Sequence, residues 1–465
     1  MLKNALFILS GNAAASLFLL ARNLIVARMI PVADYGVAAT FALAMGVVEM
    51  ASTLGLQQQI IQAKEGDDPR FQAALQGFQL LRGVIAGVAL FAVAGPFARF
   101  LGIPEVTWAY QILAVVPILN ALQHFDIHRL NRHMRFGPLL LTGTVPATAA
   151  LALAWPLAVW FGDWQVMLWS IIVQAAIGAL TSHLMAERPY QLVWDRTVIS
   201  GSLRFGWPLL VNAILMFLVF QGDKLIVSRA LGMEALAVFA MGMTLTLTPT
   251  LVLAGSASNL FLPRLSQAAQ APNFAVEAQK TLQTISLSAL LFVLIVLLIG
   301  APVVHMLLGV KYAALLPLLI WLALGQALRV MKAGPAIVAL ALGQTSNAMV
   351  ANLVRVMGLP LAWVVVAKGG DLLDILLISI AAEGLGLWVS LALMLSRSNL
   401  PKMRILMQQG MIVSMIVAVG IWAWHHPPDV GVASWPLWLA SGIGILTALI
   451  FLPDLTRACR RRRPQ

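Results

Sequence analysis

Long apolar stretches run through this sequence and constrain its fold more than any single motif does. A helix needs about 20 residues to cross the hydrocarbon core of a membrane, and apolar stretches of this length recur along the whole chain. Hydrophobic residues make up 60% of the chain and charged residues 10%, whereas soluble proteins have roughly 45–50% and 25%. The runs lack the ten-residue alternation of barrel strands. The sequence therefore predicts an all-α polytopic membrane protein.

We predict about 14 transmembrane helices, each about as long as the membrane is thick. The stretch 312–342 is too long for one straight helix, so we expect Gly334-Pro335 to break or kink it. The loops between spans are too short to form a soluble domain. The predicted spans cover residues 5–30, 34–56, 75–98, 105–126, 137–161, 163–186, 203–230, 234–262, 281–308, 312–342, 346–367, 371–396, 405–424 and 433–453.

Positive charge is distributed unequally between the two sides of the predicted spans. With the N-terminus inside, most of the 30 Lys and Arg residues fall on the cytoplasmic side, and the other side keeps Arg28, Arg99, Arg229, Lys311 and Lys368. Cytoplasmic loops of membrane proteins carry such an excess. We therefore expect both termini in the cytoplasm, and we attribute the net charge of +12 to this asymmetry rather than to nucleic-acid binding.

Two short segments recur at nearly the same offset. Leu24–Arg28 resembles Leu225–Arg229 at an offset of 201, and Phe100–Ile103 resembles Leu307–Val310 at an offset of 207. An even number of spans separates the copies, which predicts parallel repeats with the substrate path between them. We predict an N-terminal six-helix bundle at 1–200, a C-terminal six-helix bundle at 201–400, and two accessory helices with a basic cytoplasmic tail at 401–465.

Several short motifs recur along the chain in a fixed order: Thr53–Gln57 with Ile60–Gln62, Met134–Phe136, Asp223 with Leu225-Ile226, Phe261–Ser266, and Leu308–Tyr312. Their order and spacing resemble the polysaccharide transporter family of oligosaccharide flippases, which belongs to the superfamily of multidrug/oligosaccharidyl-lipid/polysaccharide exporters. The resemblance covers nearly the whole chain, although Leu236–Phe239 departs from the Gly-Leu-Tyr often found there. It implies a fold of two six-helix bundles around a central cavity, with two accessory helices.

The resemblance implies a function and a location. A member of this family would be a flippase in the bacterial cytoplasmic (inner) membrane that moves undecaprenyl-diphosphate-linked oligosaccharide outward by alternating access. Such cargo supplies surface polysaccharide biosynthesis, of lipopolysaccharide or exopolysaccharide. The implied partners are the lipid-linked oligosaccharide, membrane lipids, and a polysaccharide polymerase or other assembly proteins.

Charged residues inside the predicted spans are the candidate site residues, because such residues are costly in a membrane and usually kept for a function or a partner. An anionic diphosphate needs fixed cations. Arg82 could instead extend its side chain to the membrane interface. Lys224 could instead form a structural ion pair with Asp223 or Glu49. The candidate substrate-binding cations are Arg22, Lys224, Arg355, Arg82, Arg329 and Lys332.

Asp223 and Glu49 are the candidate coupling residues. Burial raises the pKa of a carboxyl group and a neighbouring cation lowers it, and this competition tunes a proton switch. A fixed ion pair between the halves is an equally open interpretation of Asp223. The sequence contains no phosphate-binding loop, no nucleophile constellation and no metal-ligand spacing. We therefore expect no cofactor and no enzymatic activity, with coupling to a H⁺ or Na⁺ gradient as one energy source.

Two other functions are alternatives to the flippase. A cation-coupled multidrug antiporter of the same superfamily should have an acid-rich cavity, which the cations inside the spans argue against. A membrane glycosyltransferase or polymerase needs catalytic carboxylates or a large external loop, and the longest outside loop, at about 425–434, is short.

Overall fold

The computed structural model describes residues 2–51, 54–398, 400–425 and 442–444. These residues form helices joined by short turns, without a strand in the described ranges, which confirms the all-α prediction. The chain divides into two compact units, unit 1 at residues 1–237 and unit 2 at 238–465. The bundle boundaries drawn at 200 and 400 stay a prediction.

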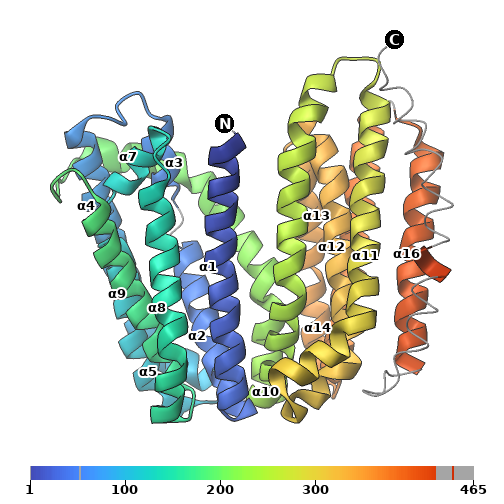
Figure 1. Ribbon diagram of the computed structural model, residues 1–465, viewed down its shortest axis with the longest axis horizontal. Coiled ribbons are helices and arrows are strands. Elements are labelled where there is room, and N and C mark those ends of the chain that lie inside the picture. Colours follow the sequence, from blue (N-terminus) through green and yellow to red (C-terminus); the bar gives the residue numbers. More distant parts are fainter. Residues whose placement is uncertain (1, 52–53, 399, 426–441, 445–465) are drawn as a thin grey trace. The chain divides into compact units, whose positions relative to one another are not determined.

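The described residues of unit 1 form ten helical elements and the start of an eleventh. Figure 1 labels most of them. Helix α8 packs against α1 and α9, and α4 packs against α5 and α6. The elements are α1 Leu2–Met29, α2 Val32–Ala51, α3 Leu56–Gln62, α4 Pro69–Leu101, the 3₁₀ helix η1 Pro104–Val106, α5 Thr107–Leu113, α6 Val115–Ala121, α7 Asp126–Arg132, α8 Gly137–Phe161, α9 Gln165–Met185 and α10 Arg196–Ala268, which continues into unit 2.

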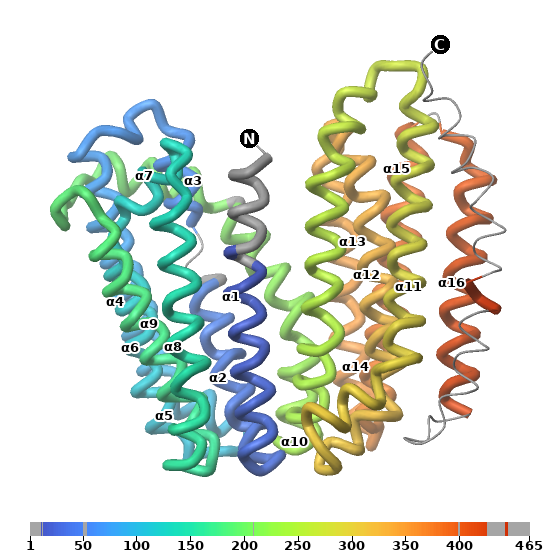
Figure 2. The backbone as a smooth tube through the Cα atoms, viewed as in Figure 1, coloured from blue at the N-terminus to red at the C-terminus, as the bar shows by residue number. Residues whose placement is uncertain are grey.

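Unit 2 is organised around α12. This helix packs against α11, α15 and α16, and α15 in turn packs against α13 and α14. Figure 2 shows α11, α12, α15 and α16 running alongside one another. The elements are α11 Phe274–Leu308, the 3₁₀ helix η2 Val310–Leu315, α12 Leu316–Ala341, α13 Ser346–Val356, α14 Gly358–Ala367, α15 Leu372–Ser396 and α16 Lys402–His425.

The described residues include 10 helices that are long and apolar enough to span a membrane, or 11 if the bent pair Pro104–Ala121 and Asp126–Arg132 counts as one span. The predicted number of 14 is not confirmed. Leu209–Ala268 counts as one stretch of 60 residues, although it covers most of two predicted spans. The predicted span 433–453 lies outside the described residues except for 442–444.

Gly232 interrupts the regular backbone of α10. Its φ of 86° and ψ of −179° are not helical, and this conformation is open essentially to glycine alone. The interruption falls between the predicted spans 203–230 and 234–262. The regular helical backbone of α10 is therefore interrupted at a glycine, at the junction predicted between the two spans.

Helix α12 is not broken at Gly334-Pro335, so the expected break is wrong, and a kink there stays a prediction. Helix α12 continues through Pro335 to Ala341, and the long stretch is divided instead near its start, where η2 ends at Leu315. Proline removes one backbone donor, but neighbouring helices satisfy or bury the freed group in membrane proteins. Gly334 and Pro335 are both buried among such neighbours.

The helices pack in the same order in both units. Helix α11 corresponds to α4, α12 to α5 and α6, α15 to α9, and α13 with α14 to α8. In unit 1, α4 packs against α5 and α6, α6 packs against α9, and α9 packs against α8. In unit 2, α11 packs against α12, α12 against α15, and α15 against α13 and α14. Both α4 and α11 end at a glycine with positive φ, Gly102 and Gly309, and a 3₁₀ helix follows soon after. These shared features agree with the offset of 207 between the two copies.

Helix α4 shows how small residues allow close packing while apolar ones face outward. Its buried face carries Gly83, Gly87 and Ala94, while Ile85 and Phe91 are exposed. A Cβ on Gly87 would lie 2.7 Å from the carbonyl oxygen of Ala114. Small residues at this spacing bring helix backbones together in membranes. The exposed apolar side chains suit a lipid environment.

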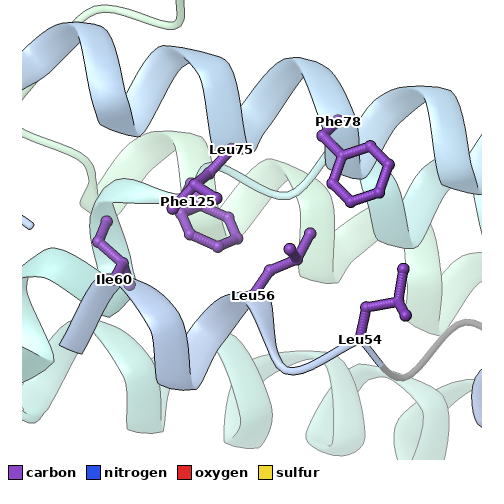
Figure 3. Close-up of a cluster of buried hydrophobic side chains, with 6 residues drawn as sticks. All are labelled: Leu54, Leu56, Ile60, Leu75, Phe78 and Phe125. Carbon is purple, nitrogen blue, oxygen red and sulfur yellow. The ribbon is translucent and has the colours of Figure 1, made fainter. Parts of the chain in front are cut away.

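A buried apolar cluster anchors the short helix α3 against α4. Leu56 and Ile60 of α3 lie against Leu75, Phe78 and Phe125, as Figure 3 shows. The C-terminal carbonyl groups of α3 are satisfied by Arg132 Nη1, which donates to Ile61 at 2.7 Å and to Ala63 at 2.6 Å. These contacts fix α3, whose first residues line the cavity described below.

Candidate functional site

One buried carboxylate in unit 2 gathers three cations. Glu383 on α15 is 2% exposed, and its Oε1 lies 2.6 Å from Lys332 Nζ and 3.7 Å from Arg329 Nε. Its other oxygen, Oε2, lies 3.2 Å from Arg355 Nε. Lys332 also donates to Asn352 Oδ1 at 3.1 Å. We call Arg329, Lys332, Arg355 and Glu383 the Glu383 cluster.

Helical spacing explains why these side chains converge. Arg329 and Lys332 are three residues apart on α12, and Asn352 and Arg355 are three apart on α13, so each pair shares one helix face. Helix α15 packs against both α12 and α13. Glu383, on its buried face, therefore meets both pairs.

The Glu383 cluster contains three cationic side chains and one acidic side chain, and no other described acid of unit 2 joins it. The other described acids of unit 2 lie elsewhere: Glu277 pairs with Lys280 at 2.7 Å, while Asp371 and Asp374 form a capping box at the start of α15. Separating buried charges from water is costly unless opposite charges compensate them. Glu383 supplies that compensation, and an anionic ligand would add to it.

A cavity of about 480 Å³ lies within unit 1. Glu49 of α2 and Arg82 of α4 are both in its wall, so two predicted site residues lie at one cavity. Six amide side chains share that wall: Gln57, Gln58, Gln79, Asn120, Gln123 and Gln174. The wall is therefore strongly polar although it is built between apolar helices.

Arg22 adjoins this cavity through Gln174. Its Nη1 donates to Gln174 Oε1 at 2.9 Å, and its Nε and Nη2 donate to Asn23 Oδ1 at 3.2 Å and 3.0 Å. Arg22 is 8% exposed. These contacts hold the guanidinium against α9, behind the cavity wall.

Two glutamines satisfy the irregular backbone between α6 and α7. Gln79 Nε2 donates to the carbonyl oxygen of Ala121 at 3.0 Å, and Gln76 Nε2 donates to that of Gln123 at 3.0 Å. Gln76 Oε1 accepts from the backbone N–H of Phe125 at 2.9 Å. Backbone without helical partners is tolerated at such depth only when protein groups satisfy it. The glutamines thus keep this side of the cavity in place.

The structure distributes the predicted site residues over three places. Arg329, Lys332 and Arg355 meet at Glu383 in unit 2. In unit 1, Glu49 and Arg82 line the cavity and Arg22 adjoins it. Asp223, which is buried, and Lys224, which is partly buried, lie side by side in sequence on α10. Their roles in binding and coupling stay predictions.

Glu383 is the residue whose importance sequence reasoning missed. It stands out in the sequence only as one acid within a predicted span, and its partners are 28 to 54 positions away in the chain. The available signal was the pair Arg329 and Lys332 on α12 together with Arg355 on α13, since buried cations are costly unless opposite charge compensates them. Within the described residues, no group of three or more His, Cys, Asp and Glu residues is placed to hold a metal ion.

Comparison with solved structures identifies the fold. The lipid II flippase MurJ in an inward closed conformation aligns over 98% of this chain and 99% of its own, with a TM-score of 0.74 and 14% identity. An inward-facing multidrug resistance transporter of the MATE family and MOP superfamily aligns over 82% of this chain and 94% of its own, with a TM-score of 0.68 and 15% identity. The chain therefore shares the fold of these transporters.

Comparison with characterised sequences gives a partial match. The succinoglycan biosynthesis transport protein ExoT of Rhizobium meliloti is 21% identical over 248 residues, which cover 52% of this chain and 49% of the relative. The match thus spans about half the length of that relative. The model of a family described as polysaccharide biosynthesis protein matches residues 25–317. Because this match covers more than half of the chain, the protein belongs to the polysaccharide biosynthesis protein family, as its motifs indicated.

Proposed function

We propose that the protein is a flippase of the bacterial cytoplasmic membrane that moves an undecaprenyl-diphosphate-linked oligosaccharide by alternating access. The observation that carries this proposal is the Glu383 cluster, in which cations outnumber the one buried acid. A diphosphate is the anionic part of such a cargo, and fixed arginine and lysine groups recognise it through charge-assisted hydrogen bonds. The family and the transport role in the name of the R. meliloti relative support the same proposal.

The cluster gives a physical account of how the cargo would be held. Without cargo, Glu383 compensates Lys332 and Arg355 at 2.6 Å and 3.2 Å. A diphosphate entering beside these groups brings further negative charge to a site that has an excess of positive charge. The cations can then bind phosphate oxygens while Glu383 keeps part of its contacts. The positive charge of the cluster therefore stays balanced throughout binding.

Transport of this kind involves no covalent reaction, and we assign the protein no enzymatic step. Its energy source is proposed to be a H⁺ or Na⁺ gradient, with Asp223 and Glu49 as the coupling residues. We also propose that both termini lie in the cytoplasm, following the distribution of Lys and Arg in the loops. A polysaccharide polymerase acting on the delivered cargo is a proposed partner.

The test measures the crossing of lipid-linked oligosaccharide in proteoliposomes that contain the purified protein. The cargo is the lipid-linked pool extracted from the producing strain, and a membrane-impermeant lectin reports how much reaches the outer surface. The double variant Arg329→Gln/Lys332→Gln is compared with Lys280→Gln, which removes a cation of the same unit that pairs with Glu277 outside the cluster. Hydrogen bonds to charged groups contribute about 1.5–3 kcal/mol each, so we expect the double variant to lose transport at least about tenfold.

The same preparation separates the flippase from the antiporter. Lys280→Gln should transport as the wild type does, and Arg22→Gln and Lys224→Gln extend the test to the predicted cations of unit 1. Wild-type vesicles that move no glycolipid, yet expel cationic dyes when a proton or sodium gradient is imposed, would contradict the proposal and favour the multidrug antiporter.

A further inference from the structure

We infer that the cavity of unit 1 binds the uncharged sugar portion of the cargo, separately from the diphosphate. This inference rests on the proposed flippase function and assigns that cargo a second recognition site. The cavity volume of about 480 Å³ lies within the range of about 300–1,000 Å³ that is usual for ligand pockets. Its wall, rather than its size, indicates the class of ligand.

The wall is rich in amides and nearly balanced in charge. Each amide side chain carries a carbonyl acceptor and an NH₂ donor, and sugar hydroxyls likewise both donate and accept. The charged residues in the wall are one acid and one cation, Glu49 and Arg82, together with the titratable His128. Such a wall suits hydroxyl groups, whereas the cation excess needed for a diphosphate occurs in the Glu383 cluster.

Part of this wall is already fixed and part of it is adaptable. Gln79 donates to two backbone carbonyl groups, and Gln174 accepts from Arg22, so both amides have set orientations. The side chains of Gln58 and Asn120 make no hydrogen bond to other described residues. Gln58 is exposed on α3 and Asn120 is partly exposed on α6. These two amides are thus available to a sugar, and their removal should leave the fold intact.

The experiment compares two cargoes in the proteoliposome assay. One is the full lipid-linked oligosaccharide pool, and the other is undecaprenyl diphosphate that carries a single glucose. The double variant Gln58→Ala/Asn120→Ala is tested beside Gln62→Ala, which removes an exposed glutamine from the same helix α3 outside the cavity wall. Thermal unfolding of all three proteins in detergent checks that each is folded.

We expect the double variant to move the full oligosaccharide roughly tenfold more slowly than the wild type, equivalent to about 1.4 kcal/mol. Its transport of the single-sugar lipid should fall much less, since that cargo offers few hydroxyl groups to the wall. Gln62→Ala should match the wild type with both cargoes. Arg329→Gln/Lys332→Gln should slow both cargoes, because both carry the diphosphate.

Two results would overturn the inference in distinguishable ways. If the wild type moves both cargoes and the double variant slows neither, or slows both equally, the sugar site is wrong while the flippase function stands. If the wild type moves neither cargo, the proposed function fails and the sugar site fails with it.

Discussion

Lys332 Nζ lies 2.6 Å from Glu383 Oε1, on the one carboxylate that Arg329 and Arg355 also approach. The compensation within this cluster is therefore asymmetric. Removing one cation leaves Glu383 with two cationic partners, whereas removing the carboxylate of Glu383 takes the shared anion from all three cations. A buried ion pair that loses one partner leaves an uncompensated charge, and here the consequence depends on which partner is removed.

Glu383→Gln should therefore destabilise the protein more than Lys332→Gln does. Loss of one partner from a buried pair costs about 3–5 kcal/mol, and Glu383→Gln leaves three cations without their shared anion. After Lys332→Gln, Arg355 still lies 3.2 Å from the carboxylate, so the free energy of unfolding should fall by a smaller amount. Thermal unfolding of both variants in detergent measures the difference, and equal losses would contradict the asymmetry.

The cluster also shows where sequence-based prediction ends. The cations Arg329, Lys332 and Arg355 stand out in the sequence because charges within apolar spans are costly. Nothing in the linear order indicates that all three meet the same acid, since that depends on α15 packing against both α12 and α13. The cavity of unit 1 is a similar case. Arg82 and Glu49 were predicted site residues, but their common wall forms only when α2 and α4 pack within the unit.

Backbone features differ in how far the sequence predicts them. The spans 203–230 and 234–262 follow from apolar length, and Gly232 lies at their junction, where only glycine adopts the observed conformation readily. That conformation was not itself predicted. Pro335 does not break α12 as expected, because the effect of a proline depends on the neighbours that bury it.

Gly83→Ala should destabilise unit 1, whereas Gly143→Ala should not. A Cβ on Gly83 would overlap the Cβ of Ala121 and lie 2.8 Å from the carbonyl oxygen of Pro117. Overpacking of this kind costs about 1–3 kcal/mol. Beyond its chain neighbours and the backbone of its own helix, Gly143 of α8 has no described atom within 4 Å of an added Cβ, and alanine is favoured over glycine in a helix by up to about 1 kcal/mol. Thermal unfolding should show a lower midpoint for Gly83→Ala only. A similar drop in the unfolding midpoint of Gly143→Ala would contradict the close packing of α4 and α6.

The exposed pair formed by Asp67 and His133 should make a small, pH-dependent contribution to stability. His133 Nε2 lies 2.6 Å from Asp67 Oδ1, and this hydrogen bond lowers the pKa of the Asp67 carboxyl group below its usual value of 3.8, with help from the charges of Arg132 and Arg129. A lowered pKa in the folded state stabilises the protein above the unfolded pKa, and the benefit is lost as the pH falls through the folded pKa.

Asp67→Asn should therefore lower stability slightly at pH 7, by less than about 1 kcal/mol, since both side chains are solvent-exposed and their charges are screened. The difference from the wild type should shrink below about pH 4. Unfolding midpoints at pH 7 and at pH 3 test this, and a difference that persists unchanged at pH 3 would show that the carboxyl charge is not its cause.

The two glycines that follow α4 and α11 should differ in what they tolerate, although their φ angles of 79° and 77° are nearly the same. Gly102 has a ψ of 19°, in the left-handed helical region that asparagine also enters, at a cost of about 1–2 kcal/mol for most residues. Gly309 has a ψ of −173°, in a region that is essentially closed to all other residues. Apart from chain neighbours, no described atom lies within 4 Å of a Cβ added at either position, so backbone conformation alone distinguishes the two glycines. We expect Gly102→Asn to unfold near the wild-type midpoint and Gly309→Asn to unfold at a clearly lower temperature. If both variants match the wild type, then Gly309 does not hold this conformation, and the turn after α11 has the same backbone requirement as the turn after α4.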